Sequence, residues 1–100
     1  MDDALPAEEL VTIAEAIHKH QGPDATYHGL RTRKSGPMRF IDFHLLVPGA
    51  NSVREAHDLC CLIEKEIEAA LERAEVTIHV EPIECDSSYE GKIVTDCEKC

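Results

Sequence analysis

Histidine and carboxylate side chains are the residues of this chain whose types and spacing could do chemistry. Five of them lie in segments that should form strands or a helix, and they are His28, His44, His57, His79 and Glu81. Imidazole nitrogens and carboxylate oxygens are ligands of Zn²⁺ and of neighbouring divalent transition metals. We therefore predict a metal site that draws on these five residues.

The alternation of apolar and polar residues indicates where most of these donors point. In the segment 38–47, Ile41, Phe43 and Leu45 share one face and should be buried, which leaves His44 on the other face. In the segment 76–83 the apolar set is Val76, Ile78 and Val80, so His79 and Glu81 lie on the opposite face. Side chains from two strands thus converge on one surface, and His28, near the start of another strand, can reach its rim.

The cysteines do not form the pattern of a disulfide framework, because their number is odd and two of them are adjacent. They are Cys60, Cys61, Cys85, Cys97 and Cys100. His57 precedes Cys60 and Cys61 by about one helical turn, so an imidazole and a thiol could share a helix face. The alternative is that these two cysteines pack as small apolar residues. We expect Cys60, Cys61, Cys97 and Cys100 to be accessory metal ligands at most.

Helical and strand periodicities place five elements along the chain. The sequence predicts a helix over 6–20, strands over 27–34 and 38–47, a helix over 52–73 and a strand over 76–83. In the second helix, Ser52 and Glu55 have the spacing of a capping box. The order α-β-β-α-β predicts an α+β open sandwich in which two helices cover one face of a three-stranded sheet.

Domain organisation follows from where this periodicity ends. Residues 1–84 should form one domain, and residues 85–100, which end in Cys97-Glu-Lys-Cys100, should form a flexible tail. The spacing of Cys97 and Cys100 is that of half a thiolate zinc site, but a second pair is missing.

Composition narrows the classes of partner. Twenty acidic against 10 basic side chains give a net charge of −10, which opposes binding to nucleic acid and favours binding to cations. No apolar run approaches the roughly 20 residues of a membrane helix. We expect a soluble, cytoplasmic chain.

Four stretches of the sequence resemble one known family. They are His28–Gly36, Arg39–Leu45, Ala56–Asp58 and Ile78–Pro82, and together they are similar to the cytoplasmic C-terminal domain of cation diffusion facilitator (zinc transporter) proteins over residues 4–84. The resemblance implies a metallochaperone-like (ferredoxin-like) fold, a homodimer, and zinc bound at the subunit interface. It also implies that His28, His44, His57, His79 and Glu81 occupy the family's ligand positions, although Glu81 stands where aspartate is common.

The expected function is binding of a divalent metal by a homodimer that senses metal or regulates its transport. The expected ion is Zn²⁺, with Cd²⁺ or another divalent transition metal as alternatives, and the expected partners are a second copy and the membrane part of a cation transporter. The chain could be an excised transporter domain or a free-standing homologue. Two other functions stay open, a metal-independent dimerisation module and a small metal-dependent hydrolase, but we do not expect an enzyme because the sequence shows no nucleophile motif.

Overall fold

Two helices and three strands follow one another in the order α-β-β-α-β, which confirms the prediction. The computed structural model describes residues 4–85. The elements are α1 (Ala7–Gln21), β1 (Thr26–Ser35), β2 (Met38–Val47), α2 (Val53–Ala70) and β3 (Ala74–Pro82), followed by a short 3₁₀ helix (Ile83–Cys85). Most of the predicted tail, including Cys97 and Cys100, lies outside the described residues.

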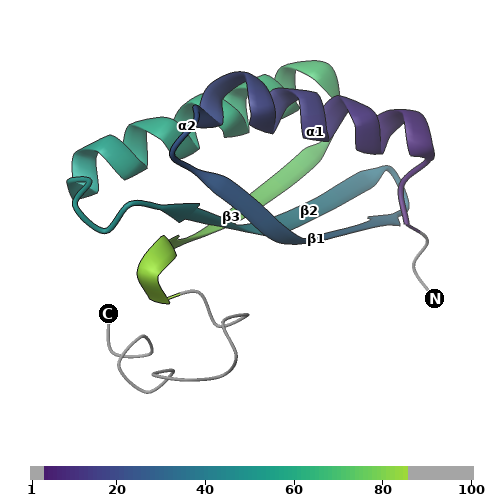
Figure 1. Cartoon of the computed structure of the whole chain (residues 1–100). Coiled ribbons are helices and arrows are strands. Elements are labelled where there is room, and N and C mark those ends of the chain that lie inside the picture. The colour runs from purple at the N-terminus through teal and green to yellow at the C-terminus, as the bar shows by residue number, and fades with distance from the viewer. Residues whose placement is uncertain (1–3, 86–100) are drawn as a thin grey trace.

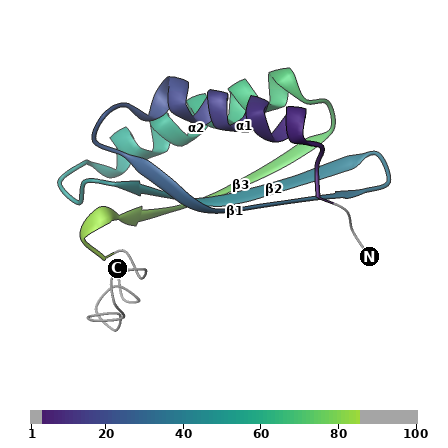
Figure 2. The same cartoon turned by 45° about the vertical axis from the view of Figure 1, so that its right-hand side comes forward.

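The sheet has the order β1-β2-β3, with β2 in the centre. β1 and β2 form an antiparallel hairpin, whereas β3 runs parallel to β2. A parallel neighbour requires a crossover, and α2 supplies it. Both helices lie on the same face of the sheet, and the hairpin twists beneath them (Figures 1 and 2). Neither helix covers the other face, which we call the open face.

The core fills the space between the helices and the sheet. The centre of β2 contributes Ile41, Phe43 and Leu45, each at most 1% exposed. The helices contribute fully buried isoleucines, which are Ile13, Ile17, Ile63 and Ile67. Among the described residues no polar or charged residue is buried. The apolar alternation in β2 thus sends its polar side chains, including His44, to the open face.

The ends of α2 show one correct prediction and one error. The capping box is present, since the Ser52 Oγ accepts from the Glu55 N–H at 3.0 Å and the Glu55 carboxylate accepts from the Ser52 N–H at 2.7 Å. The predicted helix end at Arg73 is wrong, because the helix ends at Ala70. Leu71 is extended, and Arg73 has a left-handed φ of 53° that reverses the chain into β3. β3 consequently begins at Ala74, two residues before its predicted start.

Arg39 joins three elements at the start of β2. Its guanidinium donates to both oxygens of Glu9 on α1, at 2.9 and 3.0 Å, and to the carbonyl of Glu72 at 2.6 Å. Its backbone N–H donates to the carbonyl of Arg73 at 2.8 Å. The hydrogen bond from Arg39 lowers the pKa of the Glu9 carboxyl. This arrangement fastens α1 and the turn before β3 to the same residue.

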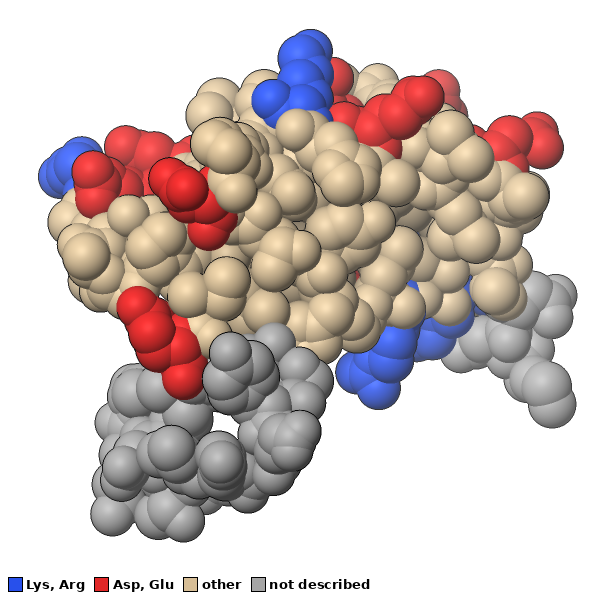
Figure 3. All heavy atoms as spheres, viewed as in Figure 1, with Lys and Arg blue, Asp and Glu red and all other residues tan. Residues whose placement is uncertain are grey.

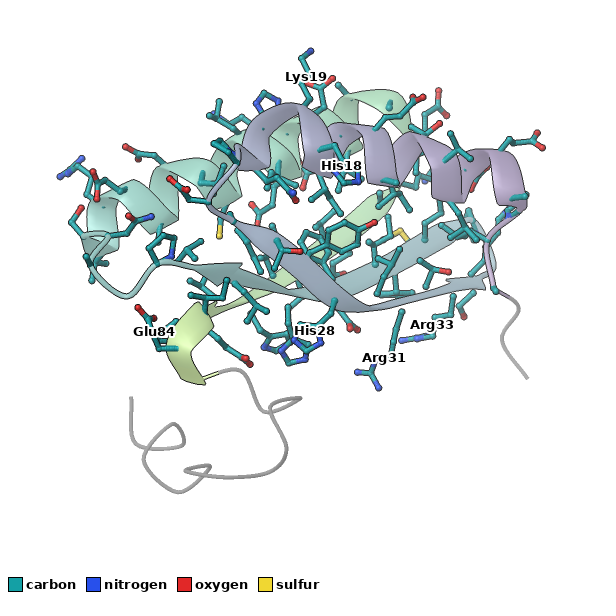
Figure 4. All side chains as sticks on the ribbon, viewed as in Figure 1. His18, Lys19, His28, Arg31, Arg33 and Glu84 are labelled. Carbon is teal, nitrogen blue, oxygen red and sulfur yellow. The ribbon has the colours of Figure 1, made fainter. Side chains whose placement is uncertain are left out.

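Charge is distributed unevenly around the fold. Figure 3 shows Asp and Glu side chains spread over the helix layer and a group of basic side chains beneath the sheet. Arg31 and Arg33 of β1 point from the open face into solvent (Figure 4). Arg31 and Arg33 are therefore basic side chains of the open face, whereas Lys19 is a basic side chain of the helix layer (Figure 4).

Candidate metal centre

Three histidines form a row across the open face. His28 of β1 is paired with His44 of β2, and His44 is paired with His79 of β3. The rings stack in sequence, with centroids 5.2 Å apart for His28 and His44 and 5.0 Å apart for His44 and His79. His28 lies beneath the sheet, on the side away from the helices (Figure 4). The pairing register of all three strands thus produces one imidazole row.

Glu81 joins this row from β3. One of its carboxylate oxygens lies 2.7 Å from Nδ1 of His44, and the two side chains are 32% and 37% exposed. One potential ligand atom from each of His28, His44 and Glu81 lies within 4.8 Å of the others. Two imidazoles and a carboxylate from three strands therefore meet at a half-exposed position, as the alternation predicts for His44 and Glu81.

The distances suit a small adjustment on metal binding. Zn–N and Zn–O bonds of about 2.0–2.1 Å at the tetrahedral angle hold two donor atoms about 3.3 Å apart. To bind one ion, Nδ1 of His44 and the Glu81 oxygen would have to separate slightly from their 2.7 Å contact. The donor nitrogen of His28, which lies within 4.8 Å of the other two donor atoms, would have to move closer to them. The donor set, imidazole and carboxylate, is one that zinc accepts. The residues present therefore fit a divalent transition metal.

Gly29 shapes the site, and sequence reasoning missed it. The β1–β2 register shifts between His28 and Arg31, which marks a bulge, and Gly29 there has a φ of 70°. A Cβ on Gly29 would lie 3.1 Å from Cδ2 of the His44 ring. Glycine within a strand pattern signals a bulge or a close approach, so the signal was available in the sequence. The bulge lets the backbone of β1 pass close to the ring of His44.

The other two predicted ligands, His79 and His57, lie outside the close group of three donors. His79 is exposed and stacks on His44, but its nitrogens do not belong to the close group of three donors. His57 lies on α2, in the layer on the opposite side of the sheet from the row, and its Nε2 lies 3.5 Å from the Sγ of Cys61. One chain therefore brings together three of the five predicted ligands and sets His57 apart.

Cys60 and Cys61, although adjacent, have different surroundings. Both are free thiols. Cys60 packs against the core, and this burial, with Glu64 nearby, raises the pKa of its thiol to about 11. A thiol with so high a pKa is a weak ligand and a weak nucleophile at neutral pH. The alternative of apolar packing therefore describes Cys60 better than it describes Cys61.

A shallow hollow of about 320 Å³ adjoins the row on the open face, lined by Arg31, Thr32, Arg33, Phe40 and Asp42. The guanidinium of Arg33 stacks over the Phe40 ring at 4.1 Å, and Nε of Arg31 lies 3.2 Å from a carboxylate oxygen of Asp42. Each guanidinium thus has a contact with a neighbouring side chain of the open face.

Comparison with known proteins shows to which family the chain belongs. Residues 5–83 match the model of the cytoplasmic domain of cation efflux proteins. The chain belongs to this family. The match confirms the resemblance to cation diffusion facilitators, and it covers all the residues of the open-face site.

Solved structures of family members share the fold. The zinc form of CzrB has 41% sequence identity and a TM-score of 0.71, covering 82% of this chain and 93% of that one. The metal-bound C-terminal domain of the CzcD transporter from Thermotoga maritima has 34% identity and a TM-score of 0.62, covering 79% and 95%. The predicted ferredoxin-like, metallochaperone-like fold is thereby confirmed.

Curated relatives are longer proteins. The cation-efflux pump FieF from Pectobacterium atrosepticum is 40% identical over 83 residues, which are 83% of this chain and 27% of that protein. A transporter from Synechocystis is 38% identical over 90 residues, 90% of this chain and 29% of that protein. This chain thus spans less than a third of the length of these relatives. Within residues 4–85, neither helix is long and apolar enough to cross a membrane.

Proposed function

We propose that this chain binds a divalent metal ion, Zn²⁺ in the first instance, at His28, His44 and Glu81, and that binding regulates cation transport. One observation carries the proposal: three donor groups from three different strands lie within 4.8 Å of one another on the open face. Family membership supports it, since cation efflux proteins act on metal ions and the solved relatives include zinc and other metal-bound forms.

Protons compete with the metal for the histidine ligands. In the metal-free site the 2.7 Å contact joins Nδ1 of His44 to Glu81, and a neutral imidazole with its proton on Nδ1 donates to the carboxylate there. A metal-bound nitrogen carries no proton, so coordination through Nδ1 places the single proton of the neutral ring on Nε2, whereas an imidazolium must release a proton before it can bind. The carboxylate that held the N–H becomes a ligand after a displacement of well under 1 Å. Binding should therefore weaken as the pH falls.

Three ligands leave one tetrahedral position, and His79 is the nearest histidine to fill it. Its exposed ring stacks on that of His44, with the two centroids 5.0 Å apart, which makes it a candidate for the fourth position. A donor from a second copy is the other source, and His57, on the helix layer, is available for such a contact. A ligand shared between two chains would convert binding free energy into association free energy. We therefore propose a homodimer that metal binding strengthens.

The proposed setting is the cytoplasmic side of a membrane. The matched domain is the cytoplasmic domain of cation efflux proteins, so the natural partner is the membrane part of a cation transporter. A metal site in such a domain would report the cytosolic metal concentration to the transport unit. The chemistry proposed is binding without catalysis.

The test is a zinc titration of the fully reduced chain, with metals per chain and oligomeric state read together by native mass spectrometry. Glu81→Gln keeps the size and the hydrogen-bonding oxygen but removes the charge, and it should weaken zinc binding by roughly 10–100-fold. Glu84→Gln is the matched control, because Glu84 lies three residues away and accepts from the Gly49 N–H.

Each outcome is informative. Discrete zinc uptake that only Glu81→Gln impairs supports the site, and a dimer that zinc strengthens supports its regulatory role. Equal affinity in both variants would contradict the role of Glu81 as a ligand. Absence of stoichiometric binding would leave a metal-independent dimerisation module.

A further inference from the structure

Two arginines lie beside the proposed metal site on the open face. Arg31 and Arg33 project from β1 on the same side of the sheet as His28 (Figure 4). Together with Phe40 and Asp42 they line the hollow of about 320 Å³ that adjoins the histidine row. We propose that this hollow binds one carboxylate of a small dicarboxylate whose other carboxylate coordinates the metal ion. This inference rests on the proposed function, because it requires an ion at the open-face site.

The register of the sheet keeps the hollow close to the metal ligands. Asp42 precedes His44 by two residues on the same face of β2, which corresponds to about 7 Å along the strand. Arg31 is paired with Asp42, and His28 is paired with His44. The volume of the hollow lies at the low end of the roughly 300–1,000 Å³ that is usual for ligand sites. A dicarboxylate with a short carbon chain therefore has the right size to join the two positions.

Arg31 is the residue best placed to hold the carboxylate. Its side chain is 80% exposed, and its Nε lies 3.2 Å from a carboxylate oxygen of Asp42. Because this contact is made through Nε, the two terminal nitrogens of the guanidinium can donate to a bound carboxylate. The guanidinium of Arg33, 4.1 Å from the centre of the Phe40 ring, adds a second positive charge to the hollow. The hollow thus offers the planar donor group that carboxylates prefer.

The surrounding charges make this binding depend on the metal. Arg31 and Arg33 are opposed by the carboxylates of Asp42, of Glu75 on the neighbouring strand and of Glu81. Without a metal, negative charge therefore exceeds positive charge, and an anion is repelled. A bound divalent ion reverses this balance, and its open tetrahedral position accepts a carboxylate oxygen. The hollow should bind a dicarboxylate only when the metal site is filled.

The proposal also changes the form in which the metal is recognised. A dicarboxylate that binds only with the ion must in turn increase the affinity for the ion, because linked binding equilibria are reciprocal. The species that the open face recognises would then be a complex of the metal with a small dicarboxylate, and not the bare ion alone.

The experiment is a calorimetric titration of the zinc-loaded and the metal-free chain with succinate, with acetate as the monocarboxylate control. We expect succinate to bind the zinc-loaded chain only, and acetate to bind it much more weakly. Arg31→Gln should weaken succinate binding about tenfold or more, because it removes a charge-assisted hydrogen bond. Arg54→Gln is the matched control, since it removes an exposed arginine from α2 in the helix layer.

Asp42→Asn tests the same site in the opposite direction. The substitution removes a negative charge from the hollow and weakens the hold of residue 42 on the Arg31 guanidinium. Succinate should therefore bind the zinc-loaded Asp42→Asn variant more tightly than it binds the wild type. Weaker binding in this variant would contradict the assignment of the hollow to an anion.

Zinc uptake measured without succinate, by native mass spectrometry, separates this proposal from the proposed function. Discrete zinc uptake with no heat from succinate would overturn the dicarboxylate site and leave the metal site standing. Equal succinate affinity in Arg31→Gln and wild type, or in the zinc-loaded and metal-free chains, would also overturn it. Absence of zinc uptake would overturn both proposals. Arg31→Gln should not weaken zinc uptake, because it removes a nearby positive charge.

Discussion

Replacing Gly29 with alanine should disturb metal binding through the ring of His44. At Gly29 the φ of 70° places the backbone in the left-handed region, where a side chain costs roughly 1–2 kcal/mol. The added Cβ would also lie 3.1 Å from Cδ2 of His44, so the ring must yield by a few tenths of an ångström to reach ordinary contact. The ring must therefore move away from the Gly29 backbone and alter its contact with Glu81.

Two other glycines separate the backbone effect from the contact. Gly22 and Gly36 have φ values of 76° and 59°, and a Cβ on either would meet nothing within 4 Å. Gly36→Ala should therefore lose about the same 1–2 kcal/mol of unfolding free energy as Gly29→Ala, whereas Gly22→Ala should lose more, because the ψ of Gly22 is 179° and this region is essentially restricted to glycine. Only Gly29→Ala should also weaken zinc binding, by about tenfold, the lower end of what disturbing the orientation of a metal ligand costs.

The assay combines urea unfolding of the metal-free chain with zinc affinity measured against a competing chelator. Wild-type zinc affinity in Gly29→Ala would refute the reasoning, because it would show that the close approach of β1 does not set the position of His44. A comparable loss of affinity in Gly36→Ala would refute it too, since the effect would then come from general destabilisation.

Two further predictions concern the scaffold. The pKa of Glu9 is lowered in the folded state, so its bond to Arg39 should stabilise the fold above the unfolded-state pKa and lose this contribution as the pH falls through the folded-state pKa. The free energies of unfolding of the wild type and of Glu9→Gln should therefore differ near neutral pH and converge in acid. A difference that stays constant with pH would contradict this prediction. Ser52→Ala should cost about 1 kcal/mol of unfolding free energy because it removes the cap of α2, whereas Ser52→Asp should retain most of the stability.

Sequence periodicity predicted the layers of this fold because burial alternates cleanly in β2. Ile41, Phe43 and Leu45 are nearly inaccessible, whereas His44 is about one third exposed on the opposite face. The same logic was less accurate in β3, where Val80, expected to face the helices, is 40% exposed. β3 is an edge strand, and its C-terminal end has fewer neighbours than the centre of the sheet.

The details that complete the site depend on backbone events that alternation does not encode. The bulge at Gly29 separates the register that pairs His28 with His44 from the register that pairs Arg31 with Asp42. The end of α2 at Ala70 depends on the left-handed Arg73 and on its carbonyl bond to Arg39, which joins segments far apart in the sequence. Long-range contacts of this kind cannot be read from local spacing.

The apolar core and the proposed ligands lie on opposite sides of the sheet. No polar residue is buried in the part of the chain that the structure describes, and the apolar core lies between the helices and the sheet. The histidine row and Glu81 lie on the other side of that sheet, partly exposed. We therefore expect the chain to fold without the metal, in contrast to small zinc domains that are unfolded without it. Under the proposed function, the free energy of binding would then be available to change how two chains associate.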